Sequence, residues 1–292
     1  MPAMKKRVWH SGWKPMLNKK SRIDLHLHSC ASDGVRTLQE IVNVALANKI
    51  DFMALTDHDT IRNTIAFSEA AREAGIAVLH GIEVSALFHS QVIHILGYGI
   101  NPDLPVLRNY QNHYQESENQ QALRTIANYR KKGAHVCEAE YEQYTYDYRR
   151  GSWKLFAYLQ DQKIISTMQD YQSELAKGHI LRSDILSAEA VIEMIHQAQG
   201  AAVIAHIFDY SNLNPELMLK TLTSQGLDGI ECYHTHHRPE QSQWLANYAN
   251  LHHLWITGGS DDHGHLSDRT MGTPRITLDQ LNLGPLMNKI QY

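Results

Sequence analysis

Short apolar segments alternate with amphipathic helical segments in two stretches of this chain, residues 23–100 and 181–292. No other feature limits the possible folds as strongly. Between the apolar segments at Ile23 and Phe52, for example, Thr37 opens a capping-box pattern that apolar residues follow at helical spacing. Such alternation predicts an α/β fold, in which a parallel sheet of about seven strands is covered by helices.

The first apolar segment contains two histidines, His26 and His28, at positions i and i+2. Side chains two residues apart leave a strand on the same face. Paired imidazoles with a nearby carboxylate, such as Asp33, can hold zinc, manganese or iron. The pair alone is also compatible with an ordinary strand that carries two histidines, so the interpretation depends on what the other strands supply.

Ligand-type residues end nearly every apolar segment. They are His26, His28, Asp33, Asp57, His58, Asp59, Glu83, His94, His206, Glu231, His234, Asp261, Asp262 and His263. Single members have ordinary explanations: Asp59 could cap the following helix, and His94 could be a hydrogen-bonded core histidine. In a closed β/α barrel, however, the C-terminal strand ends meet at one mouth. The whole set therefore predicts a metal centre at that mouth.

Two regions fall outside the alternation. Residues 101–180 lack a clear strand signal and begin with a long polar helical segment over residues 106–132. We interpret them as a helical insertion over the barrel mouth, of the kind that forms lids and substrate loops.

Residues 1–22 are a basic N-terminal extension. It is expected to dock loosely, and a role as an arm that holds a polyanion or a neighbouring subunit is the alternative.

The ordered motifs resemble those of the PHP (polymerase and histidinol phosphatase) superfamily. They are Asp24–Ser29 with Asp33–Gly34, Thr56–Asp59, Gly81–Glu83, His94–Gly97, Ala205–His206 and Gly259–Gly264. The resemblance covers residues 23–100 and 185–275, and it implies a distorted seven-stranded (β/α)7 barrel. It also implies a centre of two or three divalent ions, with manganese, iron and zinc as the candidate metals.

The resemblance assigns the ligands of each ion. It gives the first ion His26, His28, Glu83 and Asp261; the second Glu83, His94 and His206; and the third Asp33, His58 and His263. It implies a metal-dependent phosphoric monoester hydrolase that uses a hydroxide bridging two ions. Two ions that share a carboxylate suit this chemistry, and the sequence contains no nucleophile-elbow motif.

Within the superfamily the chain resembles the nucleoside 3′,5′-bisphosphate phosphatase and 5′→3′ exoribonuclease group. The expected substrate is therefore a small phosphorylated molecule, namely a nucleotide, with a bisphosphate as one candidate. Alternative substrates are a nucleoside monophosphate, histidinol phosphate or short RNA. Alternative functions are a non-catalytic metal-binding module or an amide hydrolase. The insertion departs from the known bisphosphatase pattern, because Tyr146–Lys154 stands where a Thr-Arg-x-His-like segment is found.

Several residues beyond the ligand set are candidates for substrate binding and catalysis. Arginine matches phosphate oxygens in a bidentate manner, so Arg149, Arg150 and Arg269 are predicted substrate-binding residues. Catalytic roles are predicted for Asp261, His206 and His237. Of the three neighbouring histidines His234, His236 and His237, we predict His237 as the general acid. The alternative is that the three histidines only form a histidine-rich surface loop.

Composition limits the kinds of partner and the cellular compartment that we expect for this chain. The formal net charge of −4 does not favour a polybasic nucleic-acid binder, and no apolar run is long enough to predict a membrane span. The three cysteines are far apart and odd in number, which predicts no disulfide framework and a reducing, cytoplasmic location. We infer no obligate protein partner.

Overall fold

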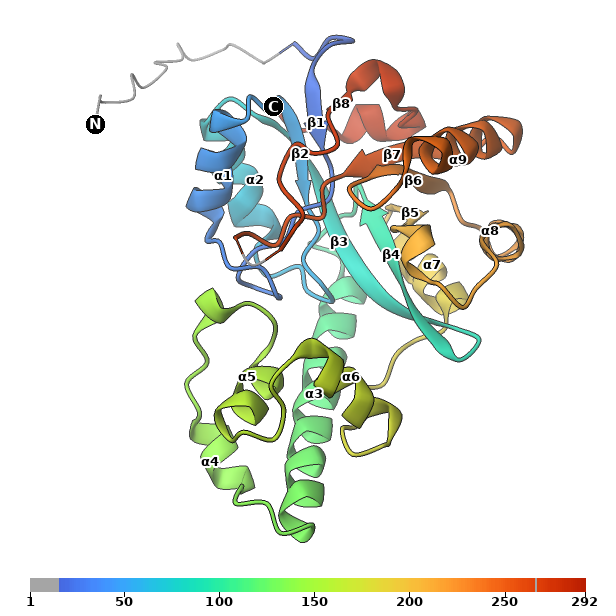
Figure 1. The fold of residues 1–292 in the computed structure, drawn as a ribbon. Helices are drawn as coiled ribbons and strands as arrows, with labels where there is room; N and C mark the ends of the chain where they lie inside the picture. The colour runs from blue at the N-terminus through green and yellow to red at the C-terminus, as the bar shows by residue number, and fades with distance from the viewer. Residues whose placement is uncertain (1–15, 266) are drawn as a thin grey trace.

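The chain forms one mixed sheet of eight strands, in the order β7-β6-β5-β4-β3-β2-β1-β8 (Figure 1). The computed structural model describes residues 16–265 and 267–292, so most of the basic extension lies outside the described residues. The strands are β1 (Arg22–Asp24), β2 (Phe52–Leu55), β3 (Ala77–Phe88), β4 (Gln91–Tyr98), β5 (Ala201–Ile204), β6 (Gly229–His234), β7 (Trp255–Gly259) and β8 (Ile276–Thr277).

Backbone hydrogen bonds between the segments that continue β1 and β7 close the sheet into a barrel. The amide of Leu25 donates to the carbonyl of Gly258 (3.2 Å), and the amide of Asp261 donates to the carbonyl of His26 (2.8 Å). This confirms the predicted α/β barrel. The eighth strand was not predicted, because β8 has two residues and pairs antiparallel with β1 beyond the closed ring.

The prediction of a wholly parallel sheet is wrong at β4. This strand pairs antiparallel with both β3 and β5, whereas the other barrel pairs are parallel. Only His89 and Ser90 separate β3 from β4, and a parallel pair would need a crossover of a dozen or more residues. In this hairpin Ser85 of β3 lies opposite His94 of β4.

Helices cover the outside of the barrel (Figure 1). They are α1 (Leu38–Ala47), α2 (Thr64–Glu73), α7 (Ala188–Gln197), α8 (Pro215–Ser224) and α9 (Pro239–Leu251), with short 3-10 turns η2 (Ile207–Asp209), η3 (Leu278–Gln280) and η4 (Gly284–Lys289). The capping box predicted at Thr37 is confirmed: its amide donates to the Glu40 carboxylate (2.8 Å), and the Glu40 amide donates to its hydroxyl (3.4 Å).

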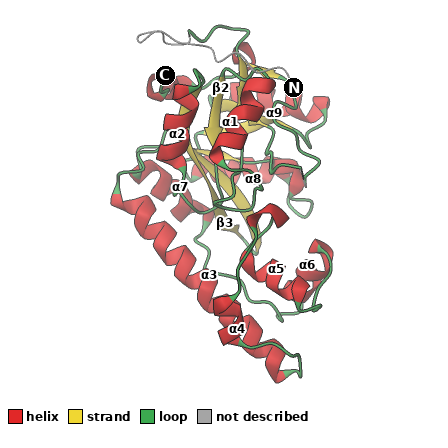
Figure 2. Ribbon diagram, turned by 90° about the vertical axis from the view of Figure 1, so that its left-hand side faces the viewer, coloured by secondary structure: helices red, strands yellow, loops and turns green. Residues whose placement is uncertain are grey.

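The segment between β4 and α7 is helical. It contains α3 (Pro105–Lys131), α4 (Glu138–Gln143), the 3-10 turn η1 (Tyr148–Arg150), α5 (Lys154–Asp161) and α6 (Met168–Ala176). Figures 1 and 2 show α3 running away from the barrel, with α4, α5 and α6 beside it. A separate hydrophobic cluster that includes Ile126, Tyr158 and Leu159 holds these helices together. Helix α6 was not predicted; it has no fully buried residue, and Tyr171 and Leu175 are its partly buried contacts with the cluster.

Two predictions from composition can be compared with the fold. Cys30, Cys137 and Cys232 are free, as expected for a chain without a disulfide framework. None of the helices in the described residues is both long and apolar enough to cross a membrane.

Candidate metal centre

The barrel mouth brings together all nine residues that were predicted as metal ligands. His26 and His28 follow β1, Asp33 lies in the next loop, His58 follows β2, Glu83 lies in β3, His94 lies in β4, His206 follows β5, and Asp261 and His263 follow β7. Eight of them fall into three candidate metal-binding groups that share members, and His206 joins the cluster through Glu83. The mouth therefore contains a continuous cluster of imidazoles and carboxylates rather than isolated polar residues.

The first group consists of His26, His28, Glu83 and Asp261, all of them buried. The Nε2 atom of His26 lies 2.9 Å from Glu83 Oε2, and that of His28 lies 2.9 Å from Asp261 Oδ1. The four candidate ligand atoms all lie within 4.8 Å of one another. Two imidazoles and two carboxylates at this spacing can surround a single divalent ion.

The second group uses the other oxygen of the same glutamate. Glu83 Oε1 lies 3.0 Å from His206 Nε2 and 3.2 Å from His94 Nδ1. The two Glu83 oxygens thus face different sets of imidazoles. A carboxylate in this position can bridge two ions.

The third group surrounds Asp33. His263 Nε2 lies 3.2 Å from Asp33 Oδ2, and His58 Nε2 lies 3.8 Å from the same oxygen. His28 joins this group as well, since its Nδ1 is 3.7 Å from Asp33 Oδ1. The Nδ1 atom of His58 is 3.4 Å from Glu83 Oε2, so His58 lies between the first and third groups.

Buried polar atoms in the cluster test whether ions fit there. His28 Nε2, His94 Nδ1 and Asp261 Oδ1 are buried, and although a polar atom of the cluster lies 2.9–3.2 Å from each, they make no contact with hydrogen-bond geometry in the described part of the chain. An unsatisfied buried polar group costs roughly 1–3 kcal/mol, which a coordinated cation would offset. All the candidate ligand atoms are nitrogen or oxygen, which suits manganese, iron or zinc. The residues present therefore fit divalent metal ions.

The charge distribution around Glu83 and Asp261 also favours cations. Burial would raise the pKa of Glu83, but neighbouring imidazoles, His58 first, lower it well below its usual value. Asp261 behaves in the same way, with His26 as the strongest lowering influence on its pKa. Burial lowers the pKa of His28, yet the Asp261 and Glu83 carboxylates raise it overall to about 10. An incoming ion must therefore displace a proton from His28.

The remaining acidic residues at the strand ends hold the ligands in place. Glu231 accepts a hydrogen bond from His26 Nδ1 (2.9 Å), which leaves Nε2 directed at the first group, and also from the His206 amide (2.9 Å). Asp57 accepts from the Ser29 amide and hydroxyl. Asp59 does not cap α2; it accepts instead from Ser85 and from Tyr110 of α3. Asp262 pairs with Arg36.

Backbone geometry next to the cluster explains part of the last motif. A Cβ atom at Gly259 would lie 2.4 Å from the His26 backbone nitrogen, so only glycine lets β7 approach His26 so closely. Asp261 and His206 adopt left-handed backbone conformations, with φ of 57° and 26°. Such conformations are uncommon for residues other than glycine and gather at functional sites.

A cavity of about 840 Å³ lies between the mouth and the helical insertion. Asp33, His58 and His94 line its mouth side, so it opens onto the second and third groups. The insertion contributes aromatic and polar side chains, namely Tyr114, Glu118, Tyr141, Tyr146, Trp153 and Tyr171. This is the size of a small-molecule site.

Three basic residues that sequence reasoning missed also line this cavity, namely Arg62, Lys154 and Arg182. No ion pair in the described residues involves Arg62 or Arg182, and Lys154 lies over the Tyr141 ring. Nothing in the local sequence distinguishes these three from other surface cations. Only the packing of the insertion against the mouth reveals them.

The predicted substrate-binding arginines occupy two different places. Arg149 pairs with Glu40 (3.2 Å) and Arg150 pairs with Asp161 (2.8 Å), and neither lines the cavity. Arg269, in contrast, lies at the metal centre, with Nη1 2.5 Å from Asp261 Oδ2. The structure therefore brings only one of the three arginines to the cluster.

The predicted general acid, His237, lies away from the ligand groups. Its ring is buried against Phe208, and its Nδ1 is 3.2 Å from the Cys232 carbonyl oxygen. Burial lowers the pKa of His237 to about 4. Such a histidine is a neutral imidazole near pH 7, and the Nδ1 proton that it retains faces the Cys232 carbonyl oxygen.

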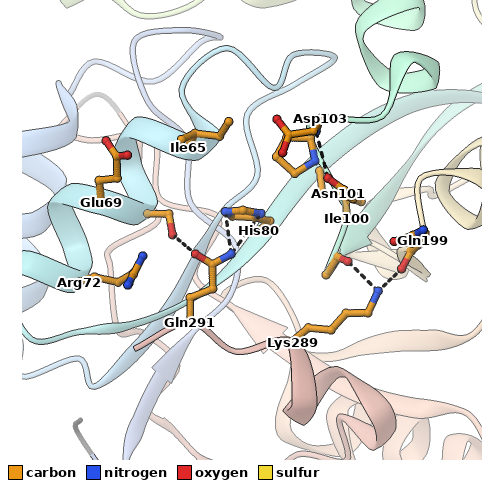
Figure 3. A pocket seen from close by; sticks show the side chains of 13 residues that line it. Ile65, Glu69, Arg72, His80, Ile100, Asn101, Asp103, Gln199, Lys289 and Gln291 are labelled. Atoms are coloured by element: carbon orange, nitrogen blue, oxygen red, sulfur yellow. Dashed lines mark hydrogen bonds between the residues drawn. The ribbon is translucent and has the colours of Figure 1, made fainter. Parts of the chain in front are cut away.

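A second cavity, of about 490 Å³, lies at the opposite end of the barrel (Figure 3). Arg72, His80, Lys289 and Gln291 line it, but none of the candidate metal-ligand groups does. Gln291 contacts His80, and Lys289 donates to the Gly99 carbonyl (3.0 Å). The candidate metal ligands are therefore concentrated at the C-terminal mouth.

Comparison with protein-family models matches residues 24–271 to the PHP domain. Among curated proteins, the chain is 30% identical over 251 residues to the 5'-3' exoribonuclease Rnm of Salmonella typhimurium, which covers 82% of this chain and 84% of the relative. It is also 30% identical over 249 residues to the 3',5'-nucleoside bisphosphate phosphatase of Chromobacterium violaceum, covering 83% and 87% of the two chains.

A solved structure resembles the whole fold. It is described as an amidohydrolase from Chromobacterium violaceum with bound sulfate and no metal. The two folds superpose with a TM-score of 0.73 at 27% identity, covering 92% of this chain and 97% of the other. The likeness thus extends over the barrel and the helical insertion together.

Proposed function

Because the chain belongs to the PHP domain family, we propose that its barrel mouth is a metal-dependent phosphoesterase site that releases phosphate from a nucleotide. The observation that carries this proposal is the position of Glu83, whose two oxygens face two different groups of imidazoles. A carboxylate shared by two ions suits the two-ion hydrolysis of a phosphate ester. The homology to curated phosphoesterases supports a hydrolase.

We assign the ligands as the motifs imply. His26, His28, Glu83 and Asp261 would hold one ion; Glu83, His94 and His206 a second; and Asp33, His58 and His263 a third. When bound, such ions lower the pKa of water and neutralise charge on the phosphate. Glu231 keeps His26 oriented towards the first ion.

The cavity determines how the rest of the substrate would be held. Its mouth side contains ligand residues, and the insertion supplies tyrosines and a tryptophan that can stack on a base. The cations Arg62 and Arg182 can bind phosphate oxygens that are not cleaved. This arrangement supports a nucleotide with more than one phosphate, in line with the bisphosphate phosphatase relative.

Exoribonuclease activity on short RNA is a second candidate, since a curated relative of equal identity has that name. The two candidates differ in the ester that is cleaved, a terminal monoester or an internucleotide diester, although both require phosphate ester hydrolysis beside a nucleoside. A non-catalytic module is disfavoured by the complete set of ligand-type residues. An amide hydrolase is disfavoured because the Arg62 and Arg182 cations suit an anionic substrate.

The experiment is phosphate release by the purified protein loaded with manganese, iron or zinc. The substrates are a nucleoside 3′,5′-bisphosphate, nucleoside monophosphates, histidinol phosphate and a short 5′-phosphorylated RNA. We expect hydrolysis of the bisphosphate to be fastest. Release of mononucleotides from the RNA at a comparable kcat/KM would favour the exoribonuclease. No hydrolysis of any substrate by fully metal-loaded protein would refute the proposal.

Replacement of a cavity cation gives a specific prediction. Arg62→Gln should lower kcat/KM for the bisphosphate by roughly 10–100-fold, because a hydrogen bond to a charged group contributes about 1.5–3 kcal/mol. Arg149→Gln is the matched control, since Arg149 pairs with Glu40 outside the cavity. A larger loss in the control would restore Arg149 as the phosphate clamp.

A further inference from the structure

We propose that Glu118 of α3 binds the base of the nucleotide substrate and makes the site prefer guanine. This inference rests on the proposed phosphoesterase function and narrows the substrate class of the same site. Glu118 lines the cavity between the barrel mouth and the helical insertion, and it belongs to none of the candidate metal-binding groups. Its role therefore concerns the part of the substrate that is not cleaved.

The position of Glu118 along α3 places it away from the ion cluster, towards the insertion. Residues four apart lie on the same face of a helix, and Tyr110, Tyr114 and Glu118 have this spacing. Tyr110 donates to Asp59, the residue that follows the candidate ligand His58. Since α3 runs away from the barrel (Figure 1), Glu118 lies about 12 Å further along the helix axis than Tyr110. A nucleoside whose phosphate lies at the ion cluster can span this length.

Aromatic side chains from the insertion share this part of the cavity with Glu118. The Trp153 and Tyr171 rings both line the cavity and meet edge to face, with their centroids 5.1 Å apart. Burial is the main cause of the raised pKa of Tyr141, and the Glu118 carboxylate is the next. Burial and then Glu118 also raise the pKa of Tyr171. The carboxylate therefore lies close to rings on which a flat base can stack.

The Glu118 carboxylate is available to a ligand. Within the described part of the chain it takes part in no hydrogen bond or ion pair, although its side chain is exposed to the cavity. Desolvation by the surrounding groups, followed by the charge of Asp59, raises its pKa. A partly desolvated carboxylate without a partner gains from N–H donors that a ligand brings.

The hydrogen-bonding pattern of the bases explains the choice of guanine. A carboxylate can accept two parallel hydrogen bonds, one at each oxygen, and guanine presents two adjacent donors, N1–H and the N2 amino group. Adenine and cytosine place a ring-nitrogen lone pair beside their amino group, and that lone pair would face the second carboxylate oxygen. Gln115, one turn earlier on α3, also lines the cavity, and its amide can donate to the O6 atom of guanine.

The test measures how kcat/KM depends on the base in manganese-loaded wild-type protein and in Glu118→Gln. The substrates are the 3′,5′-bisphosphates of guanosine, inosine and adenosine. The wild type should prefer guanosine to adenosine by roughly 10–100-fold, the discrimination of a bidentate contact with a base edge. Inosine, which lacks the N2 amino group, should fall between them. Glu118→Gln should reduce the preference to less than about threefold, mainly by raising KM for guanosine.

Glu116→Gln is the matched control, because Glu116 lies on the same helix, accepts a hydrogen bond from Gln120 and does not line the cavity. It should keep the base preference of the wild type. Equal kcat/KM for the three bases in the wild type would overturn the assignment, and this is the result expected if Glu118 holds the ribose diol instead. An unchanged preference in Glu118→Gln would overturn it as well.

A binding measurement separates this inference from the proposed function. Phosphonate analogues of guanosine and adenosine 5′-monophosphate contain a P–C bond that resists hydrolysis, so calorimetry can give their Kd for the metal-loaded protein. We expect the guanosine analogue to bind roughly 10–100-fold more tightly. Tighter binding of guanosine without hydrolysis of any phosphate ester would support the base site and refute the proposed function. Hydrolysis of all three bisphosphates with equal binding of the analogues would refute the base site alone.

Discussion

Glu83→Gln should lower phosphate release by at least about 10³-fold, the loss expected when several kcal/mol of transition-state stabilisation disappear. The substitution keeps the shape of a fully buried side chain but removes its charge. The two carboxylate oxygens face different imidazoles, three at 2.9–3.4 Å from Oε2 and two at 3.0–3.2 Å from Oε1. A neutral amide cannot serve both groups, so both ions should be affected.

Two measurements accompany this variant. Bound metal per chain should fall, while circular dichroism should show a folded barrel. Glu73→Gln, on the exposed surface of α2, is the matched control and should retain wild-type activity and metal content. Wild-type turnover in Glu83→Gln would mean that the shared carboxylate is not part of the chemistry.

Removal of the metals should abolish activity and also lower the melting temperature. A ligand that binds only the folded state at 100 times its Kd adds about 2.7 kcal/mol of stability. For a chain of this size, that corresponds to a fall in Tm on the order of 5 °C when the ligand is removed. The buried His28, Asp261 and His94 atoms that lack hydrogen-bond partners would lose the interaction that offsets their burial.

Differential scanning calorimetry of chelated and metal-loaded protein measures this change. The Tm of Glu83→Gln should respond much less to chelation than that of the wild type, because its ion sites are already impaired. An unchanged wild-type Tm after complete metal removal, verified by elemental analysis, would contradict the assignment of the buried cluster as an ion site.

The sequence was most informative about residues that follow apolar strands. His26, His28 and Glu83 were predicted as ligands from motifs at strand ends, and the structure brings them within contact of one another. Strand ends are predictable because local periodicity marks each strand, and barrel closure then gathers their C-terminal ends. The orienting role of Glu231 could have been suspected from its position on the same strand that ends in His234.

Features that depend on packing between distant segments were not predictable. Arg62 and Arg182 line one cavity although 119 intervening residues separate them in the chain. The Arg149–Arg150 pair was an attractive phosphate clamp in the sequence, but the fold directs both side chains to surface carboxylates. The antiparallel direction of β4, in contrast, follows from the local two-residue turn after Phe88.

Titration of manganese into metal-free protein, with bound ions and phosphate release from a nucleoside 3′,5′-bisphosphate followed together, tests the central claim most directly. We predict no release from the metal-free protein and full activity only when at least two ions are bound per chain, as expected for a shared carboxylate at Glu83. Full activity without bound metal, or full metal occupancy without hydrolysis of any phosphate ester, would contradict the account.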